Sequence, residues 1–154
     1  MGMQVTQDVL TKIPDPSQYD QLIHFGVSGA IVDGLNINTL IQGVSFKADD
    51  KPLLAPTLVR LPDRLEVQGV TFYCVSEPVD TDTRRSEILN QKAEVVDMES
   101  YPVARFAIKY DIPLLALRAV SDRANDSMAE DFKRHYTEAA KTLQAFMMDN
   151  LLKG

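Results

Sequence analysis

The sequence of 154 residues is poor in several features that would point to particular classes of protein. It has one cysteine, Cys74, so an internal disulfide is excluded and a reducing compartment is indicated. No run of eighteen apolar residues occurs, and residues 1–10 have neither the charged start nor the apolar stretch of a secretory signal. We therefore expect a cytoplasmic protein with no membrane partner.

Basic charge is also scarce. Lys and Arg total 16 against 22 Asp and Glu, which gives a net charge of −6, and no basic run is present. Such a chain would repel a phosphate backbone, so we expect no nucleic-acid partner. His24 and His135 do not have the spacing of a metal-binding pair, and the phosphate-binding patterns G-x-G-x-x-G and G-x-x-x-x-G-K-[ST] are missing. No metal and no nucleotide cofactor are implied.

What the sequence does contain predicts a folded domain. Apolar residues make up 45% of the chain, and neither a repeat nor a linker is visible, so we expect a single domain over residues 1–154. Residues 12–20, with two prolines, are expected to form a loop that leads into a strand over 21–26. The glycine-containing segment 26–34 is expected to turn.

Two further strands are predicted in the middle of the chain. Residues 39–46 and 69–77 are rich in β-branched and aromatic types, while residues 53–63 between them contain prolines and are expected to be irregular. These early strands could pair as hairpins. A short helix is predicted over 83–91.

The second half alternates strands with helices. A strand over 93–98, a helix from Glu99 that ends before Pro113, and a strand over 114–122 imply a right-handed parallel crossover. The last helix has a core-facing stripe at helical spacing, formed by Phe132, Tyr136, Ala139, Ala140, Leu143, Phe146 and Met147. The predicted fold class is therefore α/β, with a mixed central sheet flanked by helices.

Two segments, VVDMES (95–100) and RAVSD (118–122), stand out chemically. Each is a short apolar run that reaches a carboxylate, and an unpaired buried charge is too costly to be placed there for packing alone. If their strands are parallel neighbours, Glu99 and Asp122 would face one crevice at the carboxyl edge of the sheet. Two acids in unequal surroundings suit the cleavage of a glycosidic bond.

Each of these residues also has a purely structural interpretation. Asp122 suits a helix cap or a turn. Glu99 suits the first turn of a helix, where a carboxylate favours the helix dipole, and it could fill that role while binding a sugar. Arg118 inside a strand is more often a neutralising partner, here for Asp97 or Glu99, than a substrate ligand.

The segments HFGVSGAIVDGL (24–35) and VVDMESYPVARFAIKYDIPLLALRAVSDRAND (95–126), with the closing amphipathic helix, resemble the purine nucleoside phosphorylase and 5′-methylthioadenosine/S-adenosylhomocysteine nucleosidase superfamily. The resemblance runs from about Leu22 to the end of the chain. It implies a nucleoside phosphorylase-like fold and hydrolysis of the N-glycosidic bond of a purine nucleoside, a small-molecule partner. Phosphorolysis, with phosphate as co-substrate, is the alternative reaction.

The resemblance assigns roles to residues of both segments. Met98 and Glu99 would line the ribose pocket, with Glu99 accepting hydrogen bonds from the sugar hydroxyls. Asp122 would face N7 of the purine, where a carboxylic acid makes the base a better leaving group, and Ser121 would orient it. Arg118 matches an arginine that helps to hold the nucleophile region.

The glycine segment matches a family turn whose backbone lies close to base and sugar, which places Gly26, Ser28 and Gly29 in the pocket. The family often has a serine directly after the first glycine, and here Val27 stands there with Ser28 one position later. That serine helps to position water or phosphate, so Ser28 is its nearest substitute.

The amino-terminal portion of known members has no counterpart in this sequence. It supplies a first strand, the phosphate-binding loop of the phosphorylases and the water-activating glutamate of the nucleosidases. We therefore expect a sheet shortened at its amino-terminal side, with an exposed edge, and a homo-oligomer, with a dimer favoured. A non-catalytic member that binds nucleosides is a further alternative.

Overall fold

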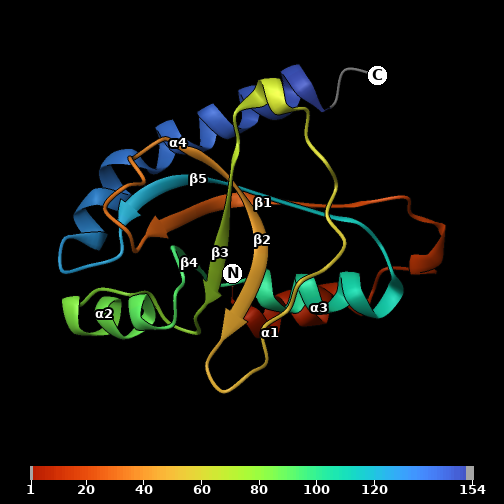
Figure 1. Ribbon diagram of the computed structural model, residues 1–154, viewed down its shortest axis with the longest axis horizontal. Coiled ribbons are helices and arrows are strands. Elements are labelled where there is room, and N and C mark those ends of the chain that lie inside the picture. The colour runs from red at the N-terminus through yellow and green to blue at the C-terminus, as the bar shows by residue number, and fades with distance from the viewer. Residues whose placement is uncertain (1, 152–154) are drawn as a thin grey trace.

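The computed structural model describes residues 2–151 and shows strands wrapped between helices (Figure 1). The predicted α/β class, with a mixed sheet flanked by helices, is confirmed. The elements, in chain order, are α1 (Met3–Leu10), a 3₁₀ turn (Pro16–Gln18), β1 (Leu22–Ala30), β2 (Leu40–Ala48), a second 3₁₀ turn (Asp63–Leu65), β3 (Gln68–Cys74), α2 (Asp82–Asn90), β4 (Val95–Asp97), α3 (Ser100–Tyr110), β5 (Leu114–Arg123) and α4 (Met128–Asn150).

The sheet closes on itself as a barrel in the order β1-β4-β3-β2-β5. Strands β2, β3 and β4 run parallel to one another, β1 and β5 run parallel to each other, and the two sets meet in antiparallel pairs. The early strands therefore form no hairpin, because β2 and β3 are parallel. The expected exposed edge is also wrong for residues 2–151, since closure of a sheet pairs its outermost strands.

Strand β1 corrects two predictions. It continues from Leu22 to Ala30 without turning, with a bulge between Ser28 and Gly29, because it pairs with β5 along its whole length and with β4 at its end. It also lies between β4 and β5, which run in opposite directions. The predicted turn over 26–34 is therefore wrong for residues 26–30, although the chain does bend and turn over 31–34, and the parallel crossover from β4 to β5 is wrong.

The helices largely match their predictions. Helix α2 begins after Thr81, whose hydroxyl accepts a hydrogen bond from the Arg84 N–H, and α3 ends before Pro113 as expected. Helix α1 was not predicted, since it buries little of its surface; Met3 and Leu10 reach the main core.

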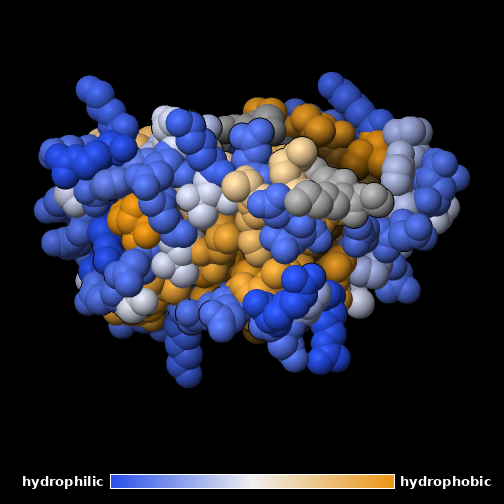
Figure 2. Space-filling view, turned by 90° about the horizontal axis from the view of Figure 1, so that it is seen from above, coloured by the Kyte–Doolittle hydropathy of each residue, from blue (hydrophilic) through white to orange (hydrophobic). Residues whose placement is uncertain are grey.

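Helix α4 covers the outer face of β1 and β5, on the upper side of the molecule in Figure 1. Leu115, Leu117 and Ala119 of β5 pack there against Ala139 and the following turns of α4. Figure 2 views the molecule from this side, where apolar side chains come to the surface among hydrophilic ones.

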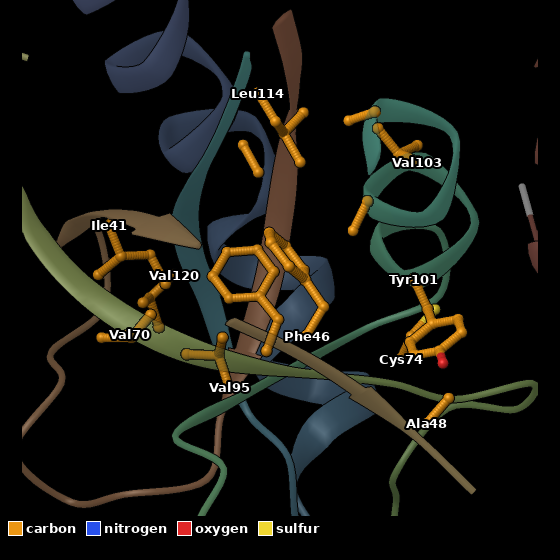
Figure 3. Packing of buried hydrophobic residues seen from close by; sticks show 14 of the residues in the cluster. Ile41, Phe46, Ala48, Val70, Cys74, Val95, Tyr101, Val103, Leu114 and Val120 are labelled. Atoms are coloured by element: carbon orange, nitrogen blue, oxygen red, sulfur yellow. The ribbon is translucent and has the colours of Figure 1, made fainter. Parts of the chain in front are cut away.

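The main core fills the barrel and its junction with α3. Figure 3 shows Phe46 lying among side chains of several strands, including Val95, Leu114 and Val120. The rings of Phe46 and Phe72 meet edge to face with centroids 5.5 Å apart. Cys74 belongs to this cluster, where burial raises its thiol pKa and so disfavours the reactive thiolate.

Candidate active site

A cavity of about 1100 Å³ lies between the end of the barrel and α4. Its wall comes from β1, the segments that follow β3 and β4, the end of β5, and one face of α4. The eight residues proposed for the site all line it, namely Gly26, Ser28, Gly29, Met98, Glu99, Arg118, Ser121 and Asp122. The two acidic segments therefore meet in one cavity, although their strands are neither neighbours nor parallel.

Strand β1 sets the spacing between the two carboxylates. In the pairing of β1 with β5, Arg118 lies opposite Gly26 and Asp122 lies opposite Gly29. Strand β4 pairs antiparallel with the end of β1, where Val96 lies opposite Gly29. The chain after β4 therefore runs back along β1, and Glu99 reaches His24. Three residues of a strand span about 10 Å. Glu99 and Asp122 thus lie toward opposite ends of the cavity, an arrangement suited to a ligand whose polar groups are at its two ends.

A buried ion pair occupies the Glu99 end. The Arg118 guanidinium donates to Asp97 Oδ2 at 2.7 Å, and the two side chains are 2% and 4% exposed. Arg118 also donates to the carbonyls of His24 and Leu117 and lies over the Phe72 ring. The structural interpretation of Arg118, as a neutralising partner, is confirmed for Asp97.

His24 connects this ion pair with Glu99. Its Nδ1 lies 3.0 Å from Arg118 Nη2, and its Nε2 lies 3.4 Å from Glu99 Oε2. Burial, followed by the charge of Arg118, lowers the pKa of the imidazole, although Glu99 and Asp97 act in the opposite direction. The hydrogen bond from His24 is the largest cause that lowers the pKa of Glu99. Sequence reasoning considered His24 only as a metal ligand and missed this contact.

Asp122 has different surroundings. It is 5% exposed and accepts a hydrogen bond of 2.7 Å from the Ser121 hydroxyl. None of the ion pairs within residues 2–151 includes it. Burial raises the pKa of its carboxyl, and the Ser121 hydrogen bond only partly opposes this. An acid held in this way favours its protonated form and can give a proton to a ligand.

Gly29 of β1 leaves space for the Asp122 side chain and does not form a turn. A Cβ at Gly29 would lie 2.7 Å from Asp122 Oδ1, whereas a Cβ at Gly26 would meet Arg118 atoms at an ordinary 3.7 Å. Between them, Ser28 is 3% exposed, and its Oγ has no hydrogen-bond partner within residues 2–151. It lines the cavity and is available to a bound ligand.

The remaining wall is mostly apolar. Pro78 and Val79 after β3 contribute to it. Phe132 and Tyr136 of α4 also line the cavity; they are 38% and 46% exposed, with ring centroids 4.9 Å apart. The first half of the α4 stripe therefore faces the cavity, so the prediction that the whole stripe packs into the core is wrong.

Metal-binding clusters and membrane-spanning helices are both absent from the part of the chain that the structure describes. Residues 2–151 contain no group of three or more His, Cys, Asp or Glu side chains placed to hold a metal ion. No helix in the same range is both long and apolar enough to cross a membrane.

Comparison of the sequence with known protein families identifies the family of this chain. Residues 42–153 match the family model of the phosphorylase superfamily. The chain belongs to the phosphorylase superfamily. This confirms the resemblance inferred from the two acidic segments, both of which lie inside the matched range.

Solved structures of similar fold include two enzymes from Helicobacter pylori. A 5′-methylthioadenosine/S-adenosylhomocysteine nucleosidase with a bound butyl-thio-DADMe-Immucillin-A has a TM-score of 0.88 and 19% identity, and the match covers 97% of this chain and 75% of that one. Futalosine hydrolase has a TM-score of 0.83 and 18% identity, with 96% and 74% covered. The nucleoside phosphorylase-like fold is thus confirmed, and the likeness extends into the residues before Leu22.

A third structure, described as a putative nucleosidase of the same type from Francisella philomiragia, has a TM-score of 0.84 and 19% identity, with 97% of this chain and 76% of that one covered. By their names, two of these proteins are nucleosidases and one is a futalosine hydrolase, and this chain shares their fold.

Proposed function

We propose that this protein hydrolyses the N-glycosidic bond of a purine nucleoside of the 5′-methylthioadenosine or S-adenosylhomocysteine type. The observation that carries the proposal is the pair of carboxylates Asp122 and Glu99 at the two ends of one cavity, the first in surroundings that favour its protonated form. A purine nucleoside has its leaving base at one end and its sugar hydroxyls toward the other.

The proposed mechanism follows from these surroundings. Asp122 hydrogen-bonds or protonates N7 of the purine, so that the base departs without a full negative charge, and Ser121 holds the acid in place. Water adds to the anomeric carbon as the bond to the base breaks, and it loses a proton to solvent, which leaves the free sugar. Glu99 remains ionised and accepts hydrogen bonds from the sugar hydroxyls, beside Met98. Arg118 keeps its guanidinium on Asp97 and supports this end of the site without contacting the ligand. The free Ser28 hydroxyl gives a further polar contact beside the glycines.

Hydrolysis is favoured over phosphorolysis by the charges in the wall. Within residues 2–151, Arg118 is the only cationic side chain that lines the cavity, and it is already bonded to Asp97 and two carbonyls. A phosphate dianion would thus meet carboxylates without a free cation. Phosphorolysis and ligand binding without turnover are kept as alternatives.

A homo-oligomer, most simply a dimer, is part of the proposal. The proposal rests on the apolar surface around the cavity, since the closed sheet has no exposed strand edge within residues 2–151. On this surface Phe25 is 56% and Met148 is 53% exposed, and both line the cavity with Phe132 and Tyr136. A second copy on this surface would shield the apolar side chains and could add a polar group to the cavity.

The test is an adenine-release assay with 5′-methylthioadenosine and S-adenosylhomocysteine, with and without phosphate, alongside light scattering. Free sugar as product at a rate independent of phosphate supports hydrolysis, whereas a sugar 1-phosphate formed only with phosphate supports phosphorolysis. Binding of adenine without turnover would leave the non-catalytic alternative. A monodisperse monomer would contradict the oligomer.

A further inference from the structure

His24 joins the two charged groups at one end of the cavity, and no role in the proposed reaction explains it. It lies in β1, and its side chain is 17% exposed. Arg118 Nη2 lies nearer to its Nδ1, at 3.0 Å, than to its Nε2, at 3.4 Å, and Glu99 Oε2 lies 3.4 Å from Nε2. Asp97 Oδ2 accepts from the same Arg118 nitrogen, Nη2, at 2.7 Å. The four side chains form a continuous series from Asp97 through Arg118 and His24 to Glu99.

The donors and acceptors in this series determine which tautomer of His24 fits. A guanidinium can only donate, so Nδ1, at 3.0 Å from Arg118 Nη2, must be the acceptor. An ionised carboxylate can only accept, so Nε2, at 3.4 Å from Glu99 Oε2, must carry the hydrogen. A neutral imidazole with its hydrogen on Nε2 meets both requirements, whereas a protonated ring would place an N–H against the guanidinium.

We infer that His24 is a positioning residue that holds the Glu99 carboxylate in the orientation in which it accepts hydrogen bonds from the ribose hydroxyls. Arg118 fixes the ring, since it is itself held by Asp97 and by backbone carbonyls. One Glu99 oxygen is then engaged by His24, and the carboxylate is presented to the cavity in a single orientation. The inference rests on the proposed sugar-binding role of Glu99.

This arrangement predicts that His24 affects binding only of ligands that carry sugar hydroxyls. A group that merely supports the fold would change the affinity for every ligand of the cavity, whereas a group that orients Glu99 changes only the affinity gained from the hydroxyls. Free adenine, 5′-methylthioadenosine and its 2′,3′-dideoxy analogue separate these cases.

The experiment measures the three dissociation constants by calorimetry in an Asp122→Asn background, which prevents turnover during the titration. His24→Leu removes both ring hydrogen bonds at similar volume, and His24→Gln retains an acceptor and a donor. His135→Gln, in α4 and outside the cavity wall, is the matched control.

His24→Leu should weaken binding of 5′-methylthioadenosine by about three- to tenfold, the usual effect of one hydrogen bond. Binding of adenine and of the dideoxy analogue should stay within about twofold, since no ordered hydroxyl contact is lost. His24→Gln should recover most of the loss, and His135→Gln should change nothing.

Equal losses for all three ligands, or no recovery with His24→Gln, would overturn the inference while leaving the proposed function intact. If the parent protein does not distinguish 5′-methylthioadenosine from its dideoxy analogue, the sugar role of Glu99 fails and the inference fails with it. Ring ¹⁵N NMR of the ligand-free protein tests the geometry separately, because the sequence has only two histidines. The His24 ring should be neutral with its hydrogen on Nε2, and a hydrogen on Nδ1 would overturn the inference.

Discussion

Asp97 and Asp122 line the same cavity and are almost equally buried, at 8% and 5% exposure, yet their surroundings are opposite. Asp97 is paired with Arg118 and accepts two further hydrogen bonds from Ser100. Asp122 has the Ser121 hydroxyl and no ion pair within residues 2–151. The comparison shows that the partner, not the burial, decides whether a buried acid stabilises the fold or remains chemically available.

The same contrast separates the two ends of the cavity. Around Glu99, the side chains of Asp97, Arg118 and His24 form a series of ion pairs and hydrogen bonds, and the hydrogen bond from His24 lowers the pKa of Glu99. Around Asp122, burial favours the neutral acid. A nucleoside placed with its sugar at the first end and its base at the second would meet a hydrogen-bond acceptor and a proton donor, respectively.

The strongest test of this contrast is Asp122→Asn. The amide retains the shape and can form hydrogen bonds but cannot transfer a proton, so adenine release should fall by about a hundredfold to ten-thousandfold. Steady-state kinetics at saturating substrate would measure the loss. Turnover near that of the wild type would assign the acid to another residue.

Asp97→Asn should act on stability. It leaves the buried Arg118 charge uncompensated, which typically lowers the free energy of unfolding by about 3–5 kcal/mol. Urea unfolding followed by circular dichroism would measure this. The double variant Asp97→Leu/Arg118→Met should be more stable than Asp97→Asn, because it removes both charges. If Asp97→Asn is as stable as the wild type, the ion pair contributes nothing to the fold.

Gly29→Ala tests the close approach of β1 to Asp122. The added Cβ would lie 2.7 Å from Asp122 Oδ1 and 3.1 Å from the Ala124 Cβ, so Asp122 has to move. We expect a loss of about 1–3 kcal/mol in stability, as in overpacked cores, together with a loss of adenine release. Gly26→Ala, with its nearest atom at 3.7 Å, is the matched control and should have a much smaller effect. Equal effects at the two glycines would refute the steric argument.

Glu99→Gln separates the sugar end from the base end. An amide accepts weaker hydrogen bonds than a carboxylate, so the affinity for 5′-methylthioadenosine should fall about tenfold while that for adenine is nearly unchanged. Calorimetry would measure both. Equal losses for nucleoside and base would exclude Glu99 as the ribose ligand.

The smallest expected effect is a gain in stability from Asp122→Asn. Burial raises the pKa of Asp122 above its ordinary value of 3.8, so ionisation of this carboxyl is less favourable in the folded protein than in the unfolded chain. The variant should be more stable at pH 7 by about 1 kcal/mol, or ~2–4 °C in Tm. The difference should shrink as the pH falls through the raised pKa toward 3.8. Thermal unfolding across this range would check it, and a gain that does not depend on pH would have another cause.

Local patterns in the sequence predicted much of this structure. The helical spacing after Glu99 and the apolar run over 114–122 identified α3 and β5, because both signals depend on near neighbours in the chain. The acidic ends of two such runs identified Glu99 and Asp122, since a buried carboxylate is unusual wherever its strand lies.

What could not be predicted depends on contacts between distant segments. Gly26 and Gly29 suggested a turn, and only the Asp122 side chain lying against Gly29 explains why a glycine occurs there inside a strand. The importance of His24 likewise depends on its two partners, neither of which is near it in sequence. The opposed directions of β4 and β5 follow from the insertion of β1 between them, which no local pattern encodes.

The pairing of β1 with β5 joins Leu22 to Leu114 and Ala30 to Arg123, so the two sides of the cavity are made by stretches far apart in the order of synthesis. During synthesis on the ribosome, β1 cannot complete its pairing with β5 until residue 123 has emerged. Closing so large a loop costs entropy before any of its contacts form, and chains with such distant pairings fold slowly. The cavity is therefore among the last features to form in a newly made molecule, and a product released before residue 114 lacks the walls that β5 and α4 supply.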